Sequence, residues 1–461
     1  HPTVAELAGR LHEGAGPDRP ALERLAHDGE VPASFAQQRL VFDVVANGPS
    51  PLYNVPIALR ISGELDVAAL GAALGDVVAR HEPLRTVFVD LDAAPAQRVL
   101  DPAQAGVDLA MVPTTAETLA ADLAAEAGHC FDLASEAPVR ACLLRLGAGE
   151  HVLSLLVHHV AVDEWSTPRL LGDLAGAYRA RRRGEAPAWP PLPVRYADYA
   201  LWQRRLLGSP EDPDSLGSRQ LAFWTEALQG APEQLQLPAD RPRPAVASRR
   251  GGVVDFTVPP EVHAGLRALA RRAGATMFMV LHAGLAALLT RLGAGTDVVV
   301  GTPVAGRADQ ALDELVGFFV NTVVLRADTS GDPGFAELVA RVRRVDLAAF
   351  DHQDLPFERV VEALNPRRSP SRHPLFQVML THQVTGDDLG DWGELAVRPE
   401  AVGTGTAKFD LAFAVCEDPP GEAMNGTVEY RADLFDAGTV DALAERFVRL
   451  LSQVAAEPDR R

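Results

Sequence analysis

Residues 155–166 read LLVHHVAVDEWS, an apolar run that ends in two adjacent histidines, His158 and His159, and is followed by an acidic turn. The leucines and valines predict a strand over the first part of this stretch. Neighbouring side chains of a strand point to opposite faces of the sheet. We therefore expect one imidazole to face the packed interior and the other to face an opening, so the two histidines cannot share one task.

Two other interpretations of this stretch compete with a catalytic one. A histidine pair at the end of an apolar strand can be a satisfied part of the core. A metal site would have to use His158, His159 and Asp163, but adjacent imidazoles diverge, and no further cluster of ligands is evident in the sequence. We expect no metal at this position.

Patterns typical of helices and strands alternate on both sides of this stretch. In the first half they predict strands at 54–61, 87–89, 139–146 and 152–159, and helices at 67–78, 115–126 and 169–182. In the second half they predict helices at 196–205, 220–227, 260–273, 277–292 and 437–454, and strands at 297–302, 322–325, 376–382, 409–415 and 427–430. This alternation predicts an α/β (α+β) fold.

The length of 461 residues exceeds what one compact core usually supports, which predicts two lobes. Residues 184–194 contain four prolines and cannot form a regular element, so they are the expected boundary. The prediction places an N-terminal lobe at 33–183, a proline-rich linker at 184–194 and a C-terminal lobe at 195–461. A short helix is expected at 1–12, followed by a linker at 13–32.

Composition excludes several classes of function. The formal net charge of −19 argues against a nucleic acid or an anionic membrane as partner. The longest apolar runs fall short of the roughly 20 residues of a membrane span, and no leader sequence opens the chain. The three cysteines lie far apart, which excludes a disulfide framework and fits a reducing compartment. We expect a cytoplasmic protein.

The spacing from His158 to Asp163 resembles the His-His-x3-Asp-Gly motif of the condensation domains of nonribosomal peptide synthetases. Six further blocks resemble the signature blocks of that family and occur in the family's order. They are SFAQQRL at 34–40, RHEPLRTVF at 80–88, YADYALW at 196–202, VGFFVNT at 316–322, HQDLPFE at 352–358 and SRHPLF at 371–376. The chain is identified as a member of that family on these seven ordered blocks.

The resemblance implies two lobes similar to chloramphenicol acetyltransferase, arranged as a V-shaped pseudo-dimer with a tunnel between them. It implies an acyltransferase that joins a donor thioester on an upstream carrier domain to the α-amine of an aminoacyl thioester on a downstream carrier domain. The 4′-phosphopantetheine arms of these carriers would deliver both substrates, so the domain itself is expected to bind no cofactor. An adjacent adenylation domain is a further expected partner, and the excised domain is expected to be monomeric.

The first residues, HPTVAELAGRL at 1–11, resemble the last helix of a peptidyl carrier domain. Residues 1–12 are therefore expected to be the end of the donor carrier. A direct connection between carrier and condensation domain leaves no epimerase between them, which favours an L-configured donor.

By motif position, the resemblance makes His159 the catalytic residue and His158 the inward, structural one. An aminoacyl α-amine has a pKa of about 7.7–8.0, so a useful fraction is already neutral at pH 7. An imidazole is suited to holding this amine and accepting its proton after attack. In the family the motif aspartate is tied to an arginine, and we expect Asp163 to pair with Arg85, with Arg307 as second choice.

Glu164 stands where the family usually has glycine. Its carboxylate could line the acceptor side and attract the α-ammonium, it could pair with Arg39, or it could turn to solvent. Trp165 and Ser166 follow it in the same turn and are expected on the same side. Trp202 and Asn321 match positions that the family associates with the active-site region, where packing or loop support is an equal alternative to substrate contact.

A rival function comes from another class. Degenerate relatives of condensation domains act as non-catalytic docking modules that recruit tailoring enzymes, and these typically lose the second histidine. Heterocyclising relatives replace the histidines with aspartates, epimerase domains do not usually follow a carrier with this set of blocks, and a free-standing acetyltransferase would bind coenzyme A. His158 and His159 are both present, which favours the condensing function.

Overall fold

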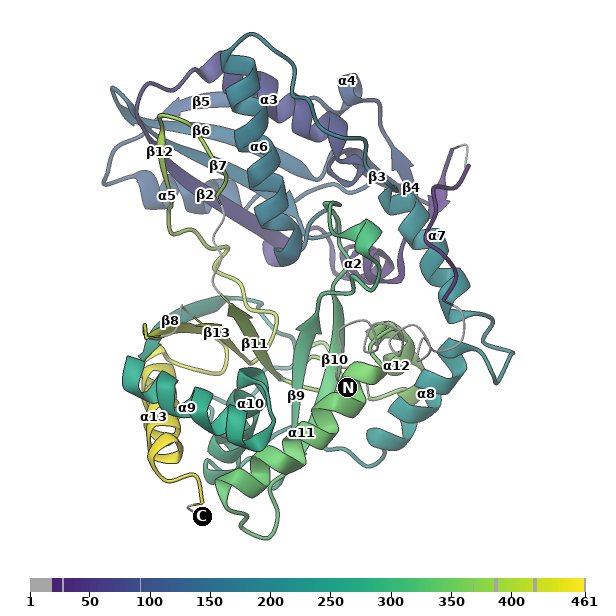
Figure 1. Cartoon of the computed structure of the whole chain (residues 1–461), viewed down its shortest axis with the longest axis vertical. Helices are drawn as coiled ribbons and strands as arrows, with labels where there is room; N and C mark the ends of the chain where they lie inside the picture. The colour runs from purple at the N-terminus through teal and green to yellow at the C-terminus, as the bar shows by residue number, and fades with distance from the viewer. Residues whose placement is uncertain are drawn as a thin grey trace, which may run out of the picture.

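The computed structural model describes residues 19–26, 29–91, 93–367, 369–384, 389–417 and 421–459. These residues form two lobes, each built of helices on a mixed β-sheet, that stand one above the other in Figure 1. The two-lobe α/β architecture predicted from the sequence is confirmed. The carrier-like helix predicted at 1–12 lies outside the described residues.

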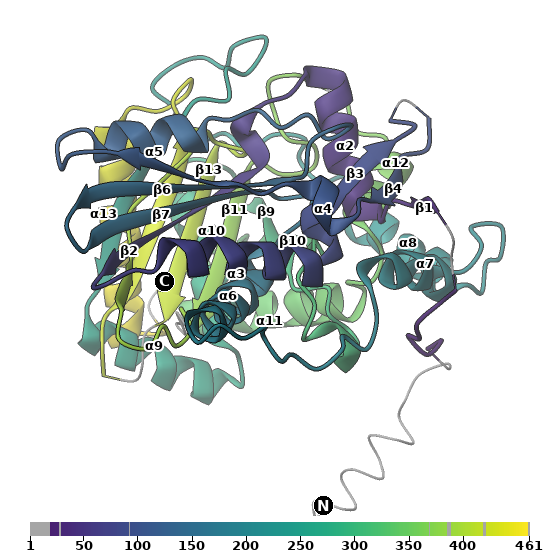
Figure 2. The ribbon, with the colours of Figure 1, turned by 90° about the horizontal axis from the view of Figure 1, so that it is seen from above.

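The first lobe contains a five-stranded sheet in the order β12-β2-β7-β6-β5. Helices α3 and α6 pack against each other on one side of this sheet, and α5 lies on the other side (Figure 2). A three-stranded sheet in the order β1-β4-β3 stands beside it. The elements are β1 Val31–Pro32, α2 Phe35–Asn47, β2 Asn54–Ser62, α3 Val67–Arg80, β3 Thr86–Val89, β4 Ala96–Val99, α4 Pro102–Ala105, β5 Leu109–Pro113, α5 Leu119–Ala127, β6 Val139–Gly147, β7 Glu150–His158 and α6 Thr167–Arg182.

The second lobe contains a six-stranded sheet in the order β10-β9-β11-β13-β14-β8. Helices α9, α10 and α13 pack together below its strands in Figure 1, and α8 and α12 pack together beside β10. The second half of the chain contributes α7 Tyr196–Leu207, α8 Leu216–Ala227, β8 Gly251–Val258, α9 Pro260–Ala273, α10 Met277–Arg291, β9 Asp297–Val304, β10 Asn321–Asp328, α11 Phe335–Asp351, α12 Phe357–Leu364, β11 Val378–Val384, β13 Leu411–Glu417, β14 Met424–Arg431 and α13 Ala437–Ala456, and also β12 Ala396–Pro399 of the first lobe's sheet.

Helix α10 shows how local sequence builds the second core. Thr276 caps its first turn by accepting a hydrogen bond from the backbone N–H of Met279. The helix is apolar almost all round, and most of its residues are buried, as expected of a helix enclosed by other elements. Among the described residues no single helix is long and apolar enough to cross a membrane, although α9 and α10, bent by 105°, pass that test as a pair.

One segment crosses from the second half of the chain into the first lobe. Strand β12 pairs antiparallel with β2, from Ala396 opposite Ser62 to Pro399 opposite Leu59. The prediction that all of 195–461 forms the C-terminal lobe is therefore wrong for this segment. Strand β2 would otherwise be an edge strand, and β12 covers its free edge. The ion pair between Arg60 of β2 and Glu400, directly after β12, joins the two strands at 2.6 Å.

Candidate active site

His158 is the inward member of the histidine pair. It ends strand β7, is only 2% exposed, and packs edge-on against Phe131 with ring centres 5.9 Å apart. Its Nδ1 accepts the backbone N–H of Val160 at 3.1 Å. Burial, with a smaller effect from the charge of Lys408, lowers the pKa of His158 to about 3. His158 is therefore a neutral part of the packing at any physiological pH.

His159 leaves the strand and turns the other way. Its backbone N–H donates to the carbonyl of Tyr53 at 2.7 Å, and its ring lies 4.9 Å from that of Phe318 in the second lobe. Its Nδ1 lies 2.8 Å from the carbonyl oxygen of Val162. A carbonyl can only accept, so Nδ1 carries the proton and Nε2 of the neutral ring is left as a proton acceptor.

The surroundings of His159 favour the neutral ring. Burial is the largest cause that lowers its pKa well below the ordinary value, followed by the positive charge of Lys408 and, more weakly, that of Arg39. The hydrogen bond to Val162 opposes this shift but does not cancel it. The ring is therefore unprotonated at Nε2 before any substrate arrives.

Asp163 fastens the turn after the histidines to the second lobe. Its Oδ1 accepts the backbone N–H of Ser166 at 2.9 Å and the Ser166 hydroxyl at 2.6 Å. Its Oδ2 accepts the backbone N–H of Phe319 at 2.9 Å. Arg307 approaches the same carboxylate at 3.5 Å and donates to the Ser166 oxygen at 2.8 Å. This buried network holds the two lobes together directly behind His159.

The first choice of partner for Asp163, Arg85, was wrong. Arg85 donates instead to the carbonyl oxygens of Leu100 and Ala79, the second of which lies near the end of helix α3. Its guanidinium is held there, in the first lobe, while Asp163 faces the second lobe. Arg307, the second choice, is the arginine that the fold brings to Asp163.

Ser166 was expected on the acceptor side, and for Trp202 packing was an equal alternative to substrate contact; both side chains pack inside the protein. Ser166 is fully buried and belongs to the Asp163 network, where its oxygen also accepts the N–H of Gly317 at 3.1 Å. Trp202 is 4% exposed and donates its indole N–H to the carbonyl of Pro20 at 2.5 Å. The polar atoms of both side chains are therefore already hydrogen-bonded within the protein.

Asn321 holds a loop of the second lobe, which is one of the two alternatives expected for it. Its amide nitrogen donates to the carbonyls of Gln353 and Leu355 at 2.9 and 2.8 Å, and its amide oxygen accepts the N–H of Phe357 at 3.0 Å. These bonds fix the chain that enters helix α12. Asn321 therefore positions this helix, and with it Glu358.

Glu164 and Trp165 are exposed at the turn after Asp163. Of the three alternatives for Glu164, the pairing with Arg39 is not the one observed, because Arg39 points from helix α2 to helix α12 of the second lobe. There its guanidinium pairs with Glu358 at 3.3 Å and lies 5.9 Å from the centre of the Phe318 ring. Glu164 instead acts on Lys408: burial lowers the pKa of that lysine, and the charge of Glu164 opposes the shift.

The fold adds two residues that were not predicted from the sequence: Lys408, whose charge acts on both histidines, and Glu358, which pairs with Arg39. Lys408 precedes strand β13, and its ammonium lies 5.3 Å from the centre of the Tyr53 ring. A signal was available for it, because Lys408 is the only lysine of the sequence. No group of three or more potential metal ligands is found among the described residues.

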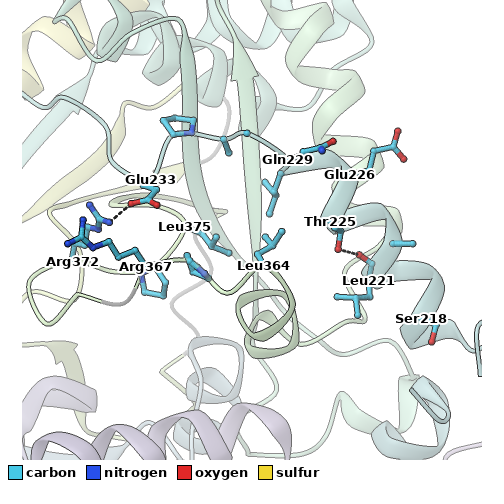
Figure 3. A pocket seen from close by; sticks show the side chains of 17 residues that line it. Ser218, Leu221, Thr225, Glu226, Gln229, Glu233, Leu364, Arg367, Arg372 and Leu375 are labelled. Carbon is cyan, nitrogen blue, oxygen red and sulfur yellow. Dashed lines mark hydrogen bonds and ion pairs between the residues drawn. The ribbon is translucent and has the colours of Figure 1, made fainter. Parts of the chain in front are cut away.

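The large cavity in Figure 3 is a separate feature of the second lobe. It has a volume of about 900 Å³ and lies between helix α8, helix α12 and the loop that carries Arg372. Leucine side chains, among them Leu221, Leu364 and Leu375, form much of its wall, and Arg372 pairs with Glu233 at 2.8 Å on one side. No histidine is among its described lining residues, so His159 does not belong to this cavity.

Comparison with known proteins gives a consistent result. A family profile described as Condensation domain matches residues 27–461. The chain is 54% identical over 460 residues to the "Probable non-canonical nonribosomal peptide synthetase (NRPS) CymA" of Salinispora arenicola, and 50% identical over 465 residues to the "Dimodular nonribosomal peptide synthase" of Bacillus subtilis. These matches cover 100% and 99% of the chain but only 6% and 19% of those relatives.

Among solved structures, the chain is similar to the X-domain from teicoplanin biosynthesis. The two share 41% identity with a TM-score of 0.90, and the match covers 96% of this chain and 98% of that one. The same X-domain has also been solved in complex with OxyB, and that chain matches with 41% identity and a TM-score of 0.89 over 96% of this chain and 97% of that one.

Proposed function

Because the chain belongs to the condensation-domain family of nonribosomal peptide synthetases, we propose that it forms an amide bond between two carrier-bound substrates. The donor is a peptidyl or aminoacyl thioester on an upstream carrier domain, with an L-configured residue favoured. The acceptor is the α-amine of an aminoacyl thioester on a downstream carrier domain. The 4′-phosphopantetheine arms of both carriers bring these groups to His159 through the space between the lobes, and the domain binds no cofactor of its own.

The observation that carries this proposal is the hydrogen bond from Nδ1 of His159 to the carbonyl of Val162 at 2.8 Å. It leaves Nε2 as the acceptor, on a ring that its surroundings keep neutral. The ring is half-buried and lies 4.9 Å from the ring of Phe318. A general base of this kind contributes about 10²–10⁴-fold to a rate.

The reaction follows from this geometry. The lone pair of the acceptor amine forms a C–N bond to the donor carbonyl carbon, and the carbonyl π electrons move to oxygen. Nε2 of His159 takes a proton from the resulting ammonium, which prevents reversal. The oxyanion then collapses, the C–S bond breaks, and the thiolate recovers a proton from the imidazolium. One thioester and one amine become one amide and one thiol.

Glu164 acts on the acceptor in this proposal. It is exposed in the turn that follows His159 and Asp163, so its carboxylate is available to the α-ammonium of an incoming acceptor. That attraction favours capture but opposes loss of the proton, so its net effect on rate is modest. Arg39 is held by Glu358, which leaves Glu164 without competition from that arginine.

The second candidate function is a non-catalytic docking module, and one observation favours it. The teicoplanin X-domain, solved with OxyB, is 41% identical to this chain and has nearly the same fold. Against it stands His159, with its free Nε2. A docking module needs a complementary surface but no proton acceptor between the lobes.

One experiment separates the two candidates. The domain is incubated with a loaded upstream carrier and a loaded downstream carrier, and the mass of both carriers is followed. Condensation moves the donor mass onto the downstream arm. Hydrolysed or unchanged carriers, together with stable binding of an oxygenase of the OxyB type, would instead support docking. Partners in the native assembly are the two carriers and an adjacent adenylation domain, and we expect the domain to be cytoplasmic and monomeric.

A further inference from the structure

Lys408 is chemically exceptional in this chain. Of the 43 lysines and arginines in the sequence, Lys408 is the only lysine. Arginine offers a broad, delocalised fork, whereas lysine offers a compact point charge with a pKa that shifts readily on burial. A chain that otherwise uses arginine for every cation has a lysine at this one place between the lobes.

The backbone of Lys408 is fixed on both sides. Its N–H donates to Oε1 of Glu429 at 3.3 Å, and its carbonyl accepts from Nη2 of Arg431 at 3.1 Å. From this anchor in the second lobe the side chain reaches the first lobe, where the ammonium lies 5.3 Å from the centre of the Tyr53 ring. The carbonyl of Tyr53 in turn accepts the backbone N–H of His159. Tyr53 thus contacts both the ammonium of Lys408, through its ring, and the backbone of His159, through its carbonyl oxygen.

The charge of Lys408 is not used by a close ion pair among the described residues. Its ammonium faces the π surface of the Tyr53 ring. An aromatic ring attracts a cation more weakly than a carboxylate group attracts it. Two carboxylates, on Glu429 and Glu164, act on it from a longer range, and Arg39 and both histidines complete the charged and titratable groups around it. Arg39, the other cation of the site, already pairs with Glu358. Of these two cations, Lys408 is therefore the one whose charge is not already taken up by a close carboxylate.

We propose that Lys408 is a further catalytic residue, whose ammonium stabilises the negative charge that develops on the donor carbonyl oxygen when the acceptor amine attacks. This inference rests on the proposed function. When the C–N bond forms, the carbonyl π electrons move to oxygen, and the fixed ammonium faces this oxyanion until the C–S bond breaks. Burial is the main cause that lowers the pKa of Lys408, and the carboxylates of Glu429 and Glu164 oppose this shift. A desolvated, preorganised charge is the arrangement that favours a developing oxyanion over a neutral carbonyl.

The test compares Lys408→Met with the wild-type domain in single-turnover transfer between loaded carriers, with the concentration of each carrier varied while the other is saturating. We expect the maximal rate to fall about 10²–10³-fold, with unchanged concentrations for half-saturation by either carrier. Loss of a lysine that only stabilises the fold would not lower the maximal rate while leaving the half-saturation concentrations unchanged. Arg398→Met, which removes an exposed cation from strand β12, is the matched control and should transfer at the wild-type rate.

The outcomes are distinct. If the wild-type domain transfers and Lys408→Met transfers equally fast, the inference about Lys408 is overturned while the proposed function stands. If the wild-type domain itself transfers nothing, the proposed function fails, and the inference fails with it.

A second measurement covers the case in which Lys408→Met does not fold. Apart from the amino terminus, Lys408 carries the only amine of the chain, so acetylation of folded wild-type protein neutralises this side chain and the terminal amine alone, and a variant without lysine reports the effect of the terminal amine. Acetylation should reduce transfer by the same factor as the substitution. The lysine-free variant Lys408→Arg, treated identically, should keep whatever rate it has before treatment. Acetylated wild-type protein that transfers at full rate would overturn the inference.

Discussion

The network around Asp163 allows a quantitative test of how the lobes are joined. We consider Asp163→Asn, which keeps the size of the side chain but removes its charge. The carboxylate is 1% exposed, and the Arg307 side chain beside it is 9% exposed. The amide group can satisfy only some of the donors from Ser166, Phe319 and Arg307, since its nitrogen is itself a donor.

The expected cost follows from burial. Removing one partner of a buried ion pair typically costs about 3–5 kcal/mol, because the remaining charge stays desolvated and unpaired. With an unfolding entropy of about 2.1 cal/mol/K per residue, a chain of 461 residues that unfolds as one unit loses about 3–5 °C of melting temperature. Lobes that unfold separately would show a larger shift in the affected transition.

Thermal unfolding followed by near-ultraviolet circular dichroism measures this shift. The matched control is Asp391→Asn, because Asp391 also joins the second half of the chain to the first lobe, through Arg179 of helix α6, but the two side chains are 65% and 44% exposed. An exposed pair contributes at most about 1 kcal/mol, so this control should melt within about 1 °C of the wild type. If Asp163→Asn melted like the wild type yet transferred nothing, Asp163 would act in the chemistry and the structural assignment would be refuted.

Three further predictions follow from the site. Burial lowers the pKa of His158 to about 3. As the pH falls below about 6.5, the unfolded chain therefore binds a proton at this histidine that the folded chain does not bind. The contribution of His158 to the free energy of unfolding then falls by up to about 1.4 kcal/mol for each pH unit. His158→Asn should remove that contribution from urea unfolding between pH 6.5 and 5, and an unchanged slope would disprove it. Trp202→Phe removes the hydrogen bond to Pro20 and should lower the free energy of unfolding in urea by about 1 kcal/mol while leaving transfer unchanged. A loss of transfer without a loss of stability would indicate that Trp202 contacts the substrate. Glu164→Gln should weaken use of the acceptor in competition assays while donor occupancy stays unchanged, and identical acceptor preference would show that Glu164 is a solvated bystander.

The sequence was most informative where periodic patterns were strong. The buried strand β7 and the helices α9 and α10 lie within one or two residues of their predicted bounds, because an enclosed element repeats apolar residues with a regular period. Strand β8 was missed because two glycines open it, and glycine weakens a strand pattern. Helix α11 was missed although its buried residues recur at helical spacing.

Long-range pairings were beyond the sequence. Arg85 and Arg307 were both reasonable partners for Asp163, and only the fold shows that Arg85 is occupied by nearby carbonyls. The four residues of β12 carry no alternating pattern, and their pairing with β2 depends on an edge that the other lobe provides. Lys408 reaches the histidines from about 250 positions away in the chain, across the boundary between the lobes. Contacts of this kind follow from the docking of the lobes rather than from any local pattern.

The central claim is that Nε2 of His159 accepts the proton of the attacking amine. The most direct measurement is the single-turnover rate of transfer between loaded carriers for His159→Ala, beside its melting temperature. The account predicts a rate about 10²–10⁴-fold below the wild type with the melting temperature nearly unchanged. The lower end of that range is expected because the amine is partly neutral at the start. A folded His159→Ala domain that transfers at close to the wild-type rate would contradict the claim.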